Sequence, residues 1–534
     1  MKTQFSRYPA PAFILGLVAM ILLARLLVLG AFPLMDPTEG RYAEIGREMV
    51  TTGNWVVPQI EEEVPFWGKP PLMFWFMAAS YSLMGFSEYS ARFPSFFLSC
   101  FTLVMVYFLA RRILNASFAL MSVLFLSTMA LFYSYAGYVA VDTALLFTVT
   151  LALSGMLCAL ISESKSGRRW WSYVFFLGLG LSLLAKGLVG AVLIMGPVIL
   201  WIWWNREWRT IRSLPWFTGL LLTLLVAVPW HIVCEMKSPG FLDYYIIGEH
   251  WKRFTVSDWE GDRYGSPHQF PRGTILLFFL ITALPWSLVF LVTLIQRPPI
   301  REISKGLLGD RVFSFLVFWF LVPLLFFTIS KNIMFTYTLP CLPAFAMLLA
   351  RVFLIEAETE HQDHLTTVSS NLIGGLALIV PTIFLLAAYF VIPLLGESRS
   401  QKELAAQFMN LDFDSDAALI YTDRMPLSGD FYAGGRAIDI PDENPDTILS
   451  HLKDVDQDYF AIEVDDLESF PFEGLALTTE VGRFGDYILR REFDPSDLPL
   501  KFVLPATPEE YDPNREISTM ETAPRLDPPP TNGS

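Results

Sequence analysis

Long apolar stretches recur along most of this 534-residue chain, and they constrain its fold more than any other feature. A helix needs ~20 apolar residues to cross a bilayer. So much apolar surface cannot all be buried in a soluble core, so it must face lipid. The pattern therefore predicts a polytopic α-helical membrane protein with about 11 transmembrane helices. The expected spans are 11–33, 93–110, 117–135, 138–161, 171–185, 187–204, 214–234, 273–296, 312–329, 333–354 and 371–395.

The composition agrees with a membrane protein and excludes other classes. Hydrophobic residues make up 53% of the chain and charged residues 17%, whereas soluble domains carry about 25% charged residues. The net charge of −15 is uneven: from residue 396 onward there are 30 Asp and Glu against 11 Lys and Arg, and the rest of the chain holds 23 against 27. No basic stripe is evident, so we expect no nucleic-acid partner. The four cysteines lie in apolar runs without paired spacing, which is typical of small buried hydrophobic residues.

Basic residues are concentrated in alternate connections between the expected spans, and this predicts the orientation of the chain. Together with Lys2 and Arg7, they place the N-terminus in the cytoplasm and two long loops, 34–92 and 235–272, on the outer side. An odd number of spans places the region after residue 395 outside as well. The connections with this bias contain Arg111 and Arg112; Lys165, Arg168 and Arg169; Arg206, Arg209 and Arg212; and Arg297, Arg301, Lys305 and Arg311.

The sequence changes character after the last expected span. We expect a transmembrane domain over 1–395, a small soluble extracytoplasmic α/β domain over 396–504 and a disordered tail over 505–534, where Pro, Asp and Glu dominate. In the α/β domain, alternation predicts one helix and three strands. The helix is Ser400–Asn410 and the strands are Ala417–Thr422, Tyr459–Val464 and Leu475–Leu489. In the first outer loop, the aromatic stretch 70–85 is expected to lie along the membrane interface.

Two carboxylates begin a predicted helix in the first outer loop. Asp36 and Glu39 lie where the helix starts, near Thr38, and Arg41 and Tyr42 follow one turn later. A carboxylate in the first turn can cap the helix and interact with its dipole. The same position at the membrane surface also suits a general base acting on an acceptor hydroxyl or amine. The residues leave both interpretations open.

Four other charged residues interrupt the hydrophobic pattern near the outer ends of the helices. Lys69 precedes an aromatic segment, where it can reach lipid headgroups or hold a phosphate as a point charge. Asp142, Lys186 and Lys331 lie at or between expected spans. An ionisable group at membrane depth is costly and usually functional, although the cost is smaller at a helix end. Their shared location on the outer side is stronger evidence than any one of them.

The second outer loop combines Glu249, His250 and Arg253 within a few residues. Their spacing matches no strong metal-site pattern, so no cofactor is evident and a divalent metal is unsupported. A cluster of His, Lys and Arg suits an anionic ligand better. Gly178 and Gly180 superficially suggest a phosphate loop, but they lack the required spacing and lie inside a hydrophobic span. Helix packing through small residues explains them better.

Several separated blocks, in one order over about residues 10–355, resemble one protein family. The sequence is similar to the lipid-linked-sugar glycosyltransferases of the GT-C class, in particular to ArnT, the lipid A aminoarabinose transferase, and to the protein O-mannosyltransferases. The blocks are Arg41-Tyr-Ala-Glu-Ile45 with Arg47-Glu-Met49, Lys69-Pro70, the Asp142 segment, Lys186-Gly187, Glu249-His250 with Arg253-Phe254, Leu284-Pro-Trp286, and Lys331 with Thr336-Tyr337.

The resemblance implies a mechanism and assigns roles to the residues. An outward-facing cavity would take a polyprenyl-phosphate sugar, the acceptor would attack the anomeric carbon, and polyprenyl phosphate would leave. Either Asp36 or Glu39 would be the base, and Lys69, Arg253 and Lys331 would hold the donor phosphate. The expected substrate contacts are Arg41, Tyr42, Asp142, Lys186, Glu249, His250 and Tyr337.

Two positions depart from the family pattern. The family has adjacent Asp and Glu in the first outer loop, but here Thr38 takes the Asp position if Glu39 keeps its place. ArnT has a Glu immediately before the Lys-Pro pair, where this chain has Gly68. The first departure leaves the choice between Asp36 and Glu39 open. The second weakens the transfer of a metal site and of the same acceptor.

We therefore predict a membrane glycosyltransferase that uses a polyprenyl-phosphate sugar and acts on a lipid, glycan or protein acceptor at the periplasmic face of the inner membrane. Membrane lipids are its other expected partners. One alternative is a secondary transporter or lipid flippase, which would place charges near the bilayer midplane. The other is a non-catalytic scaffold that displays the α/β domain. Neutralising the loop charges would leave such a scaffold working.

Overall fold

The structure is a computed structural model that describes most of residues 11–493. The described range excludes residue 62 and the segments 257–258, 266–267, 297–305, 360–369, 412–416, 441–446, 449–450, 453–457, 468–469 and 471. Contacts divide the chain into two compact units, residues 1–396 and 397–534. The predicted disorder over 505–534 lies outside the described residues.

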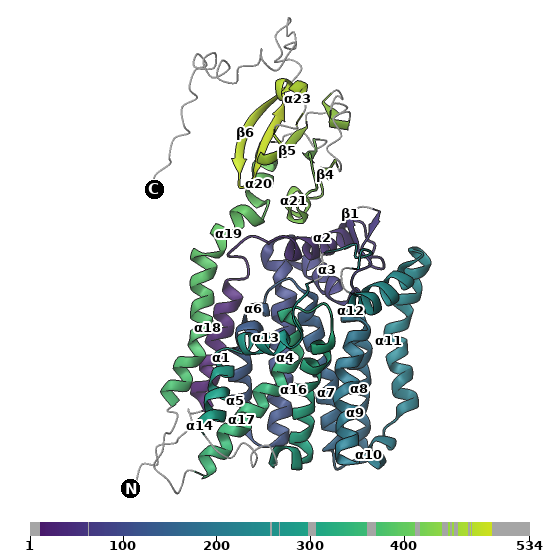
Figure 1. Ribbon diagram of the computed structural model, residues 1–534, viewed down its shortest axis with the longest axis vertical. Coiled ribbons are helices and arrows are strands. Elements are labelled where there is room, and N and C mark those ends of the chain that lie inside the picture. The colour runs from purple at the N-terminus through teal and green to yellow at the C-terminus, as the bar shows by residue number, and fades with distance from the viewer. Residues whose placement is uncertain are drawn as a thin grey trace, which may run out of the picture. The chain divides into compact units, whose positions relative to one another are not determined.

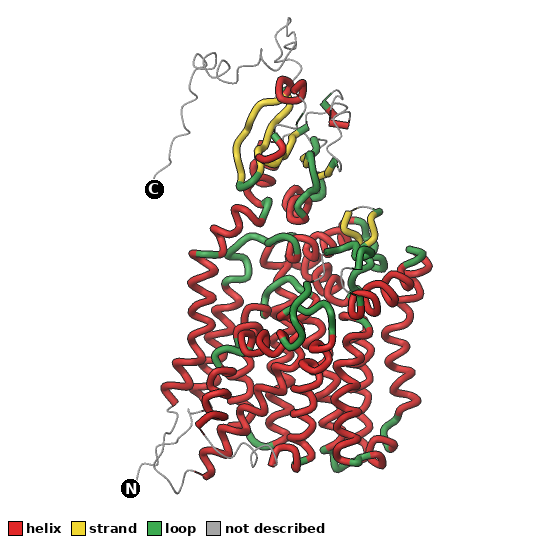
Figure 2. Tube along the Cα trace, viewed as in Figure 1, coloured by secondary structure: helices red, strands yellow, loops and turns green. Residues whose placement is uncertain are grey.

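The first unit is a bundle of helices (Figure 1; helices red in Figure 2). Among the described residues, seven helical segments are long and apolar enough to cross a bilayer, and a bent pair raises this to eight if it counts as one span. The seven are α4 (Glu88–Ile113), α7 (Val141–Leu160), α9 (Leu188–Asn205), α11 (Trp216–Lys237), α16 (Arg311–Ile329), the segment Phe335–Leu354 and the segment Asn371–Phe390. The last two belong to η2 (Phe335–Cys341) with α17 (Leu342–Thr359), and to α18 (Ser370–Phe390).

The membrane fold is as predicted, but the expected count of about 11 spans is not confirmed. Three expected spans form helices that are short or carry charges at their ends: α1 (Pro11–Leu27), α5 (Ala116–Ser127) with α6 (Ala130–Tyr135), and α8 (Lys165–Lys186). The expected span 273–296 is bent by 109° between α13 (Thr274–Thr282) and α14 (Trp286–Gln296). Pro285 lies in this break, where its missing backbone N–H interrupts the helical ladder.

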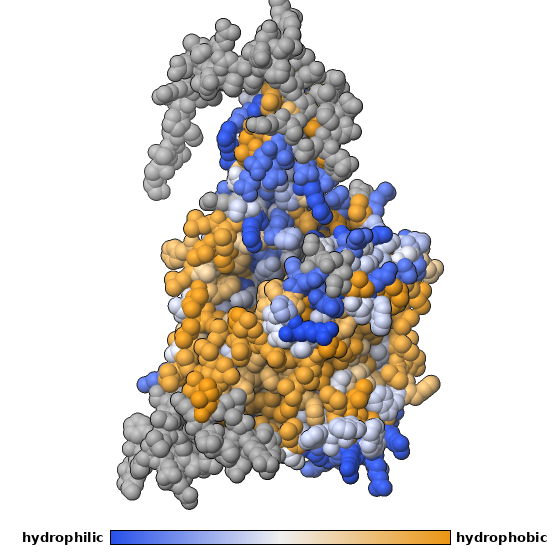
Figure 3. Space-filling view, viewed as in Figure 1, coloured by the Kyte–Doolittle hydropathy of each residue, from blue (hydrophilic) through white to orange (hydrophobic). Residues whose placement is uncertain are grey.

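Large apolar side chains cover the outside of the helical unit, as in the orange surface of Figure 3. On α11, Phe217 is 83% exposed and Leu225 is 63% exposed. Exposed apolar surface on this scale would be unfavourable in water and is favourable against lipid. The interior, in contrast, holds fully buried aromatic residues such as Trp286 and Trp319.

Helices α7 and α8 pack closely through small residues. A Cβ on Gly178 would lie 2.6 Å from the backbone nitrogen of Ala152, and one on Gly155 would lie 2.6 Å from that of Phe175. Only glycine allows the two backbones to approach this closely. The glycines of 178–180 therefore serve helix packing, and the close approach sets Asp142 at the start of α7 beside Lys186 at the end of α8.

Short elements join the helical bundle. They are α2 (Thr38–Thr51), β1 (Gln59–Glu61), β2 (Val64–Pro65), α3 (Leu72–Met84), α10 (Trp208–Arg212), the π-helix η1 (Asp243–Lys252), α12 (Arg253–Thr255) and α19 (Ile392–Arg399). The stretch 70–85 forms α3, whose Met73, Phe74 and Met77 are completely buried. Met77 contacts Gly46 of α2. The stretch thus packs against protein on one side, and its location at the membrane interface stays a prediction.

The second unit contains a five-stranded sheet in the order β4-β3-β5-β7-β6. Strand β3 is parallel to β4 and β5, and β7 is antiparallel to β5 and β6. The strands are β3 (Leu419–Tyr421), β4 (Ala437–Asp439), β5 (Tyr459–Glu463), β6 (Thr478–Phe484) and β7 (Tyr487–Glu492). The helices are α20 (Lys402–Leu411), α21 (Leu427–Ala433), η3 (Val464–Asp466) and α23 (Phe472–Leu477).

The predicted elements of the second unit agree with the structure except for one. The stretch Leu475–Leu489 was expected to be a single strand, but it begins in α23 and then forms the β6–β7 hairpin. Gly485 has φ of 56° in the turn between the two strands. A positive φ at this position favours glycine and reverses the chain.

Candidate active site

A cavity of about 420 Å³ lies in the first unit and brings together most of the predicted site residues. Its walls come from the start of α2, the loop before α3, the junctions of α7, α8 and α9, the π-helix η1, and the segment that leads into η2. Nine of the predicted residues line it: Arg41, Tyr42, Lys69, Asp142, Lys186, Glu249, His250, Arg253 and Tyr337. Segments separated by up to about 300 residues therefore meet in one recess.

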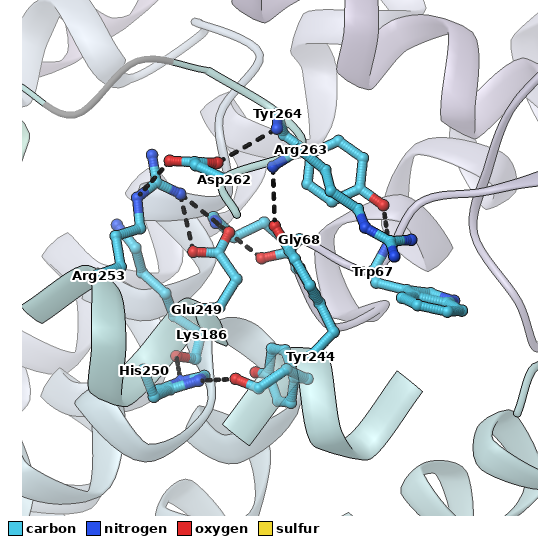
Figure 4. A network of polar contacts seen from close by, with 12 residues as sticks. Trp67, Gly68, Lys186, Tyr244, Glu249, His250, Arg253, Asp262, Arg263 and Tyr264 are labelled. Atoms are coloured by element: carbon cyan, nitrogen blue, oxygen red, sulfur yellow. Dashed lines mark hydrogen bonds and ion pairs between the residues drawn. The ribbon is translucent and has the colours of Figure 1, made fainter. Parts of the chain in front are cut away.

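Glu249 is the centre of a buried ionic cluster on one wall (Figure 4). Its Oε1 lies 2.8 Å from Nζ of Lys69, and its Oε2 lies 2.7 Å from Nη1 of Arg253. Arg253 also approaches Asp262, with 3.3 Å between Nε and Oδ2. Glu249 and Arg253 are four residues apart, which places them on one face where η1 continues into α12. The Glu249 side chain is 4% exposed, against 18% for Lys69 and 20% for Arg253.

The charge state of this cluster follows from its contacts. Burial alone would raise the pKa of Glu249, but the Lys69 ammonium and the Arg253 guanidinium outweigh it and lower that pKa to about 2. Burial lowers the pKa of Lys69, and Glu249 opposes this shift. Burial also raises the pKa of Tyr42 to about 12, so its hydroxyl stays protonated at neutral pH. At neutral pH the Glu249 carboxylate is therefore ionised and the Tyr42 hydroxyl is neutral.

A second ion pair joins Asp142 to Lys186 across the α7–α8 contact. The Oδ1 of Asp142 is 2.6 Å from Nζ of Lys186, and both side chains are largely buried. The same ammonium lies 4.7 Å from the ring centroid of Tyr337, in cation–π contact. Lys186 is therefore fixed between a carboxylate and an aromatic face at the cavity wall.

His250 connects η1 to the turn between α8 and α9. Its Nδ1 donates to the Tyr245 carbonyl at 2.7 Å, and its Nε2 accepts from the Leu188 N–H at 3.2 Å. Burial lowers the pKa of His250, in agreement with a neutral ring that carries its proton on Nδ1. Gly187 has φ of 65°, and a Cβ there would overlap the Tyr245 hydroxyl and the His250 ring. The Lys186-Gly187 block is therefore required for this close approach.

The two outer loops are also tied together around Tyr264. Arg41 donates from Nη1 to the Tyr264 carbonyl at 2.7 Å. The Trp67 N–H donates to the Tyr264 hydroxyl at 2.9 Å, and that hydroxyl donates to the Pro65 carbonyl at 3.1 Å. A Cβ on Gly68 would lie 2.8 Å from the Phe66 ring and 3.0 Å from the Tyr264 ring. Position 68 consequently has no room for a side chain.

Glu39, one of the two residues predicted as the base, does not line the cavity. Its two oxygens bind Nε and Nη2 of Arg92 at 2.9 and 2.7 Å, and Oε1 also accepts from the Val139 N–H at 3.1 Å. The Glu39 side chain is 1% exposed and that of Arg92 is completely buried. A carboxylate sealed in this way cannot reach an acceptor, so its position indicates a structural role.

Two other predicted residues also lie away from the described cavity lining. Asp36 is partly buried, and the lining begins with the next two residues, Pro37 and Thr38. Lys331 is exposed and does not line the cavity, whereas its neighbour Asn332 does. The structure thus supports neither Asp36 as a base in this cavity nor Lys331 as a phosphate-side cation.

The neutral polar residues of the cavity wall could not be predicted from the sequence. Asn332 and Thr336 line the cavity close to Tyr337. Both lie in the segment that the family resemblance singled out for Lys331 and Tyr337. In a sequence, an uncharged Asn or Thr at a helix end can either cap the helix or contact a ligand. Nothing in the sequence distinguishes these two roles.

One group of three carboxylates in the described residues is close enough to hold a metal ion. Asp423, Glu463 and Asp466 lie in the second unit, with ligand oxygens within 4.8 Å of one another. The neighbouring acidic groups and burial raise the pKa of Glu463, burial contributing most. Such exposed acidic clusters are common without an ion. In the cavity itself, Glu249 and His250 are already engaged by other protein groups.

The fold and cavity define the class of this protein: it is a multi-pass membrane protein with the GT-C fold. The structure aligns with that of ArnT from Cupriavidus metallidurans bound to undecaprenyl phosphate, with a TM-score of 0.72 and 20% identity, over 92% of this chain and 100% of that one. The apo structure of the same protein aligns similarly, with a TM-score of 0.72.

The sequence comparisons show which proteins this chain is similar to. Residues 12–245 match the family model for dolichyl-phosphate-mannose-protein mannosyltransferases. This segment is similar to that family, and the chain is similar in sequence to ArnT transferases. The undecaprenyl phosphate-α-4-amino-4-deoxy-L-arabinose arabinosyl transferase of Erwinia tasmaniensis is 30% identical over 378 residues, covering 70% of this chain and 65% of that protein. The protein of that name from Enterobacter sp. is 29% identical over 319 residues, covering 60% and 55%. The matches span only 55% to 65% of these two relatives.

Proposed function

We propose that this protein is a membrane glycosyltransferase that transfers a sugar from a polyprenyl-phosphate donor to an acceptor at the outer face of the membrane. The observation that carries the proposal is the meeting of four cations in one cavity: Arg41, Lys69, Lys186 and Arg253. They come from four distant segments, and aromatic residues complete the walls. Such a recess suits an anionic headgroup joined to a sugar.

The geometry supports a division of roles in the transfer step. Lys69 and Arg253 are the cations with exposed faces in the Glu249 cluster, and they would hold the donor phosphate. Negative charge grows on that phosphate as the glycosidic bond breaks, and fixed cations stabilise the growing charge. Glu249 keeps both cations in place. The tail of the donor would remain in lipid, and cleavage of its phosphate bond would supply the driving force without a nucleotide.

The acceptor needs a group that orients its nucleophile, and Asp142 is the best placed carboxylate. It lines the cavity, and its Oδ1 binds Lys186. Glu249 is less suited because two cations hold it and its pKa is about 2, which makes it a weak proton acceptor. We therefore assign to Asp142 the acceptor role first predicted for Asp36 or Glu39.

The names of the relatives support the donor class. They specify an undecaprenyl phosphate-linked sugar, and the solved ArnT structure holds undecaprenyl phosphate. We propose the same class of lipid carrier here. For the acceptor we retain lipid, glycan or protein, because Thr38 and Gly68 depart from the family pattern at the cavity wall. The second unit is proposed to assist in acceptor choice.

The same comparison supports an inner-membrane location. We propose that the N-terminus faces the cytoplasm, because basic residues are enriched in alternate short connections that begin with the N-terminal segment. The loops that form the cavity, and the unit after residue 396, would then lie in the periplasm or outside the cell.

A transfer assay tests this function directly. Purified full-length protein in proteoliposomes receives a labelled polyprenyl-phosphate sugar and a membrane extract as the acceptor source. We expect labelled acceptor and free polyprenyl phosphate from the wild type, and a strong loss of both with Lys69→Ala or Asp142→Asn. Movement of intact donor across the bilayer without cleavage would instead identify a flippase. Undiminished transfer by both variants would overturn the site assignment.

A further inference from the structure

Three neutral polar side chains in the cavity wall have a buried atom without a partner among the described residues: Tyr245, Asn332 and Thr336. The last two come from one segment. Asn332 is 5% exposed, and its Oδ1 accepts from the His268 N–H at 3.1 Å, while its Nδ2 has no partner among the described residues. Thr336 is 2% exposed, and its Oγ1 also has none there. Both residues line the cavity. A buried polar group without a hydrogen bond is costly, so these two atoms are available to a ligand.

The two carboxylates of the cavity, in contrast, are each paired with a cation, and we have assigned Asp142 to the acceptor. Among the described lining residues only Asp142 and Glu249 are acidic, and each forms an ion pair at 2.6 to 2.8 Å. Arg41 adds a further cation, which donates to a backbone carbonyl. A positively charged ligand group would therefore meet cations and already paired acids. An uncharged hydroxyl group would not be repelled by these cations and would not need an unpaired carboxylate.

We propose that Asn332 and Thr336 bind hydroxyl groups of the donor sugar, and that the sugar accepted by this cavity is uncharged. The inference rests on the proposed function and adds its substrate class. The Asn332 amide would donate to a sugar oxygen, and the Thr336 hydroxyl can donate or accept. The relatives' names specify an amino sugar. Its ammonium form would meet Glu249, which two cations already hold, and Asp142, which is assigned to the acceptor. The two residues thus determine specificity, while Lys69 and Arg253 hold the phosphate.

Sugar binding can be separated from phosphate binding by comparing three lipids. The first is a polyprenyl phosphate carrying a neutral pentose, the second carries the matched 4-amino pentose, and the third carries no sugar. Their dissociation constants are measured on purified full-length protein by displacement of a fluorescent polyprenyl phosphate. We expect the wild type to bind the neutral donor more tightly than the amino donor.

Two nearly isosteric variants then test the residues. Thr336→Val should raise the dissociation constant of the neutral donor about fivefold, as expected for the loss of one hydrogen bond. It should leave the dissociation constant of the sugar-free lipid unchanged. Asn332→Asp keeps an oxygen for the His268 N–H but replaces the amide donor with a negative charge. It should shift the preference about tenfold toward the amino donor, as expected for a hydrogen bond that involves a charge.

Thr338→Val is the matched control for packing. Thr338 lies in η2 two residues away, and its hydroxyl bonds to Thr282 at 2.9 Å and donates to the Phe335 carbonyl at 2.8 Å, away from the cavity lining. It should leave the ratio between donor and sugar-free lipid unchanged. A wild-type preference for the amino donor, or equal effects of both site variants on all three lipids, would overturn the inference and leave the proposed function standing. If no lipid bound, the proposed function would fail together with it.

Discussion

Two carboxylate clusters in the first unit are similarly buried and differ in their access to the cavity. Glu39 with Arg92 forms the first, and Glu249 with Lys69 and Arg253 forms the second. Each carboxylate is almost completely buried and binds a cation at 2.7 to 2.8 Å. The first is sealed from the cavity, because Arg92 also donates hydrogen bonds to the backbone carbonyls of residues 29, 32 and 33. The second opens on the cavity through Lys69 and Arg253.

We propose that this difference separates a structural cluster from a functional one. In the sealed cluster, no N–H group of Arg92 faces the cavity. The ion pair therefore serves to hold α2 and α4 together. In the open cluster, the carboxylate neutralises and orients two cations that still present faces to a ligand. Burial of the acid is the same in both, so access to the cation is what indicates function.

Arg92→Ala should give the largest effect. It leaves the Glu39 carboxylate buried without its cation, which typically costs about 3–5 kcal/mol of stability. We expect poor folding, measured as a large drop in the thermal unfolding midpoint in detergent. Arg92→Ala combined with Glu39→Gln should recover part of the loss. Unchanged stability of the single variant would contradict the sealed-cluster assignment.

Lys69→Ala should act on catalysis more than on folding. Removing one charge that stabilises a transition state typically lowers the rate ~100-fold or more. Because Arg253 still pairs with Glu249, we expect a small change in the unfolding midpoint. The rate of polyprenyl phosphate release measures the first effect. A loss of stability as large as that of Arg92→Ala would contradict the proposal that the two clusters have different roles.

Acid should act on the open cluster only at low pH. The pKa of Glu249 is lowered from an ordinary 4.5 to about 2, so its contribution to stability is fully present above pH 4.5 and is lost as the pH falls toward about 2. The unfolding midpoint of the wild type should therefore fall more steeply than that of Glu249→Gln within this window. Parallel pH profiles for the two proteins would show that the ion pairs contribute nothing.

Lys331→Ala should have the smallest effect. The side chain is exposed and lies outside the described cavity lining, and exposed charges contribute little. We expect transfer rates within about fivefold of wild type, because one screened surface charge is worth at most ~1 kcal/mol. A loss comparable to that of Lys69→Ala would restore its predicted role at the phosphate.

The sequence predicted the membrane fold and nine cavity residues because those signals are local or strongly patterned. Apolar runs predict helices, and charges at their outer ends are rare enough to be noticed. The number of spans was harder to predict from the sequence, because the lengths of α1 and α5 and the bend near Pro285 depend on tertiary contacts. The pattern also gave no indication that Leu475–Leu489 would turn back on itself as a hairpin.

The role of Glu39 could not be predicted, because its partner is distant in sequence. Arg92 lies 53 residues further along, inside an expected span, and only the folded chain brings the two together. For the same reason the sequence could not show which of the adjacent residues Lys331 and Asn332 lines the cavity. Lys331 is exposed, whereas Asn332 is buried in the cavity wall. Ionic groups attract attention in a sequence, while a neutral amide with one unpartnered nitrogen becomes visible only through its burial.

Native mass spectrometry of the purified full-length protein with added polyprenyl phosphate tests the central claim most directly. If the open cluster holds the lipid phosphate, the wild type and Lys331→Ala should each retain one lipid, and Lys69→Ala and Arg253→Ala should lose it. Equal retention by all four proteins, at lipid concentrations that do not saturate the wild type, would show that these cations do not hold the phosphate.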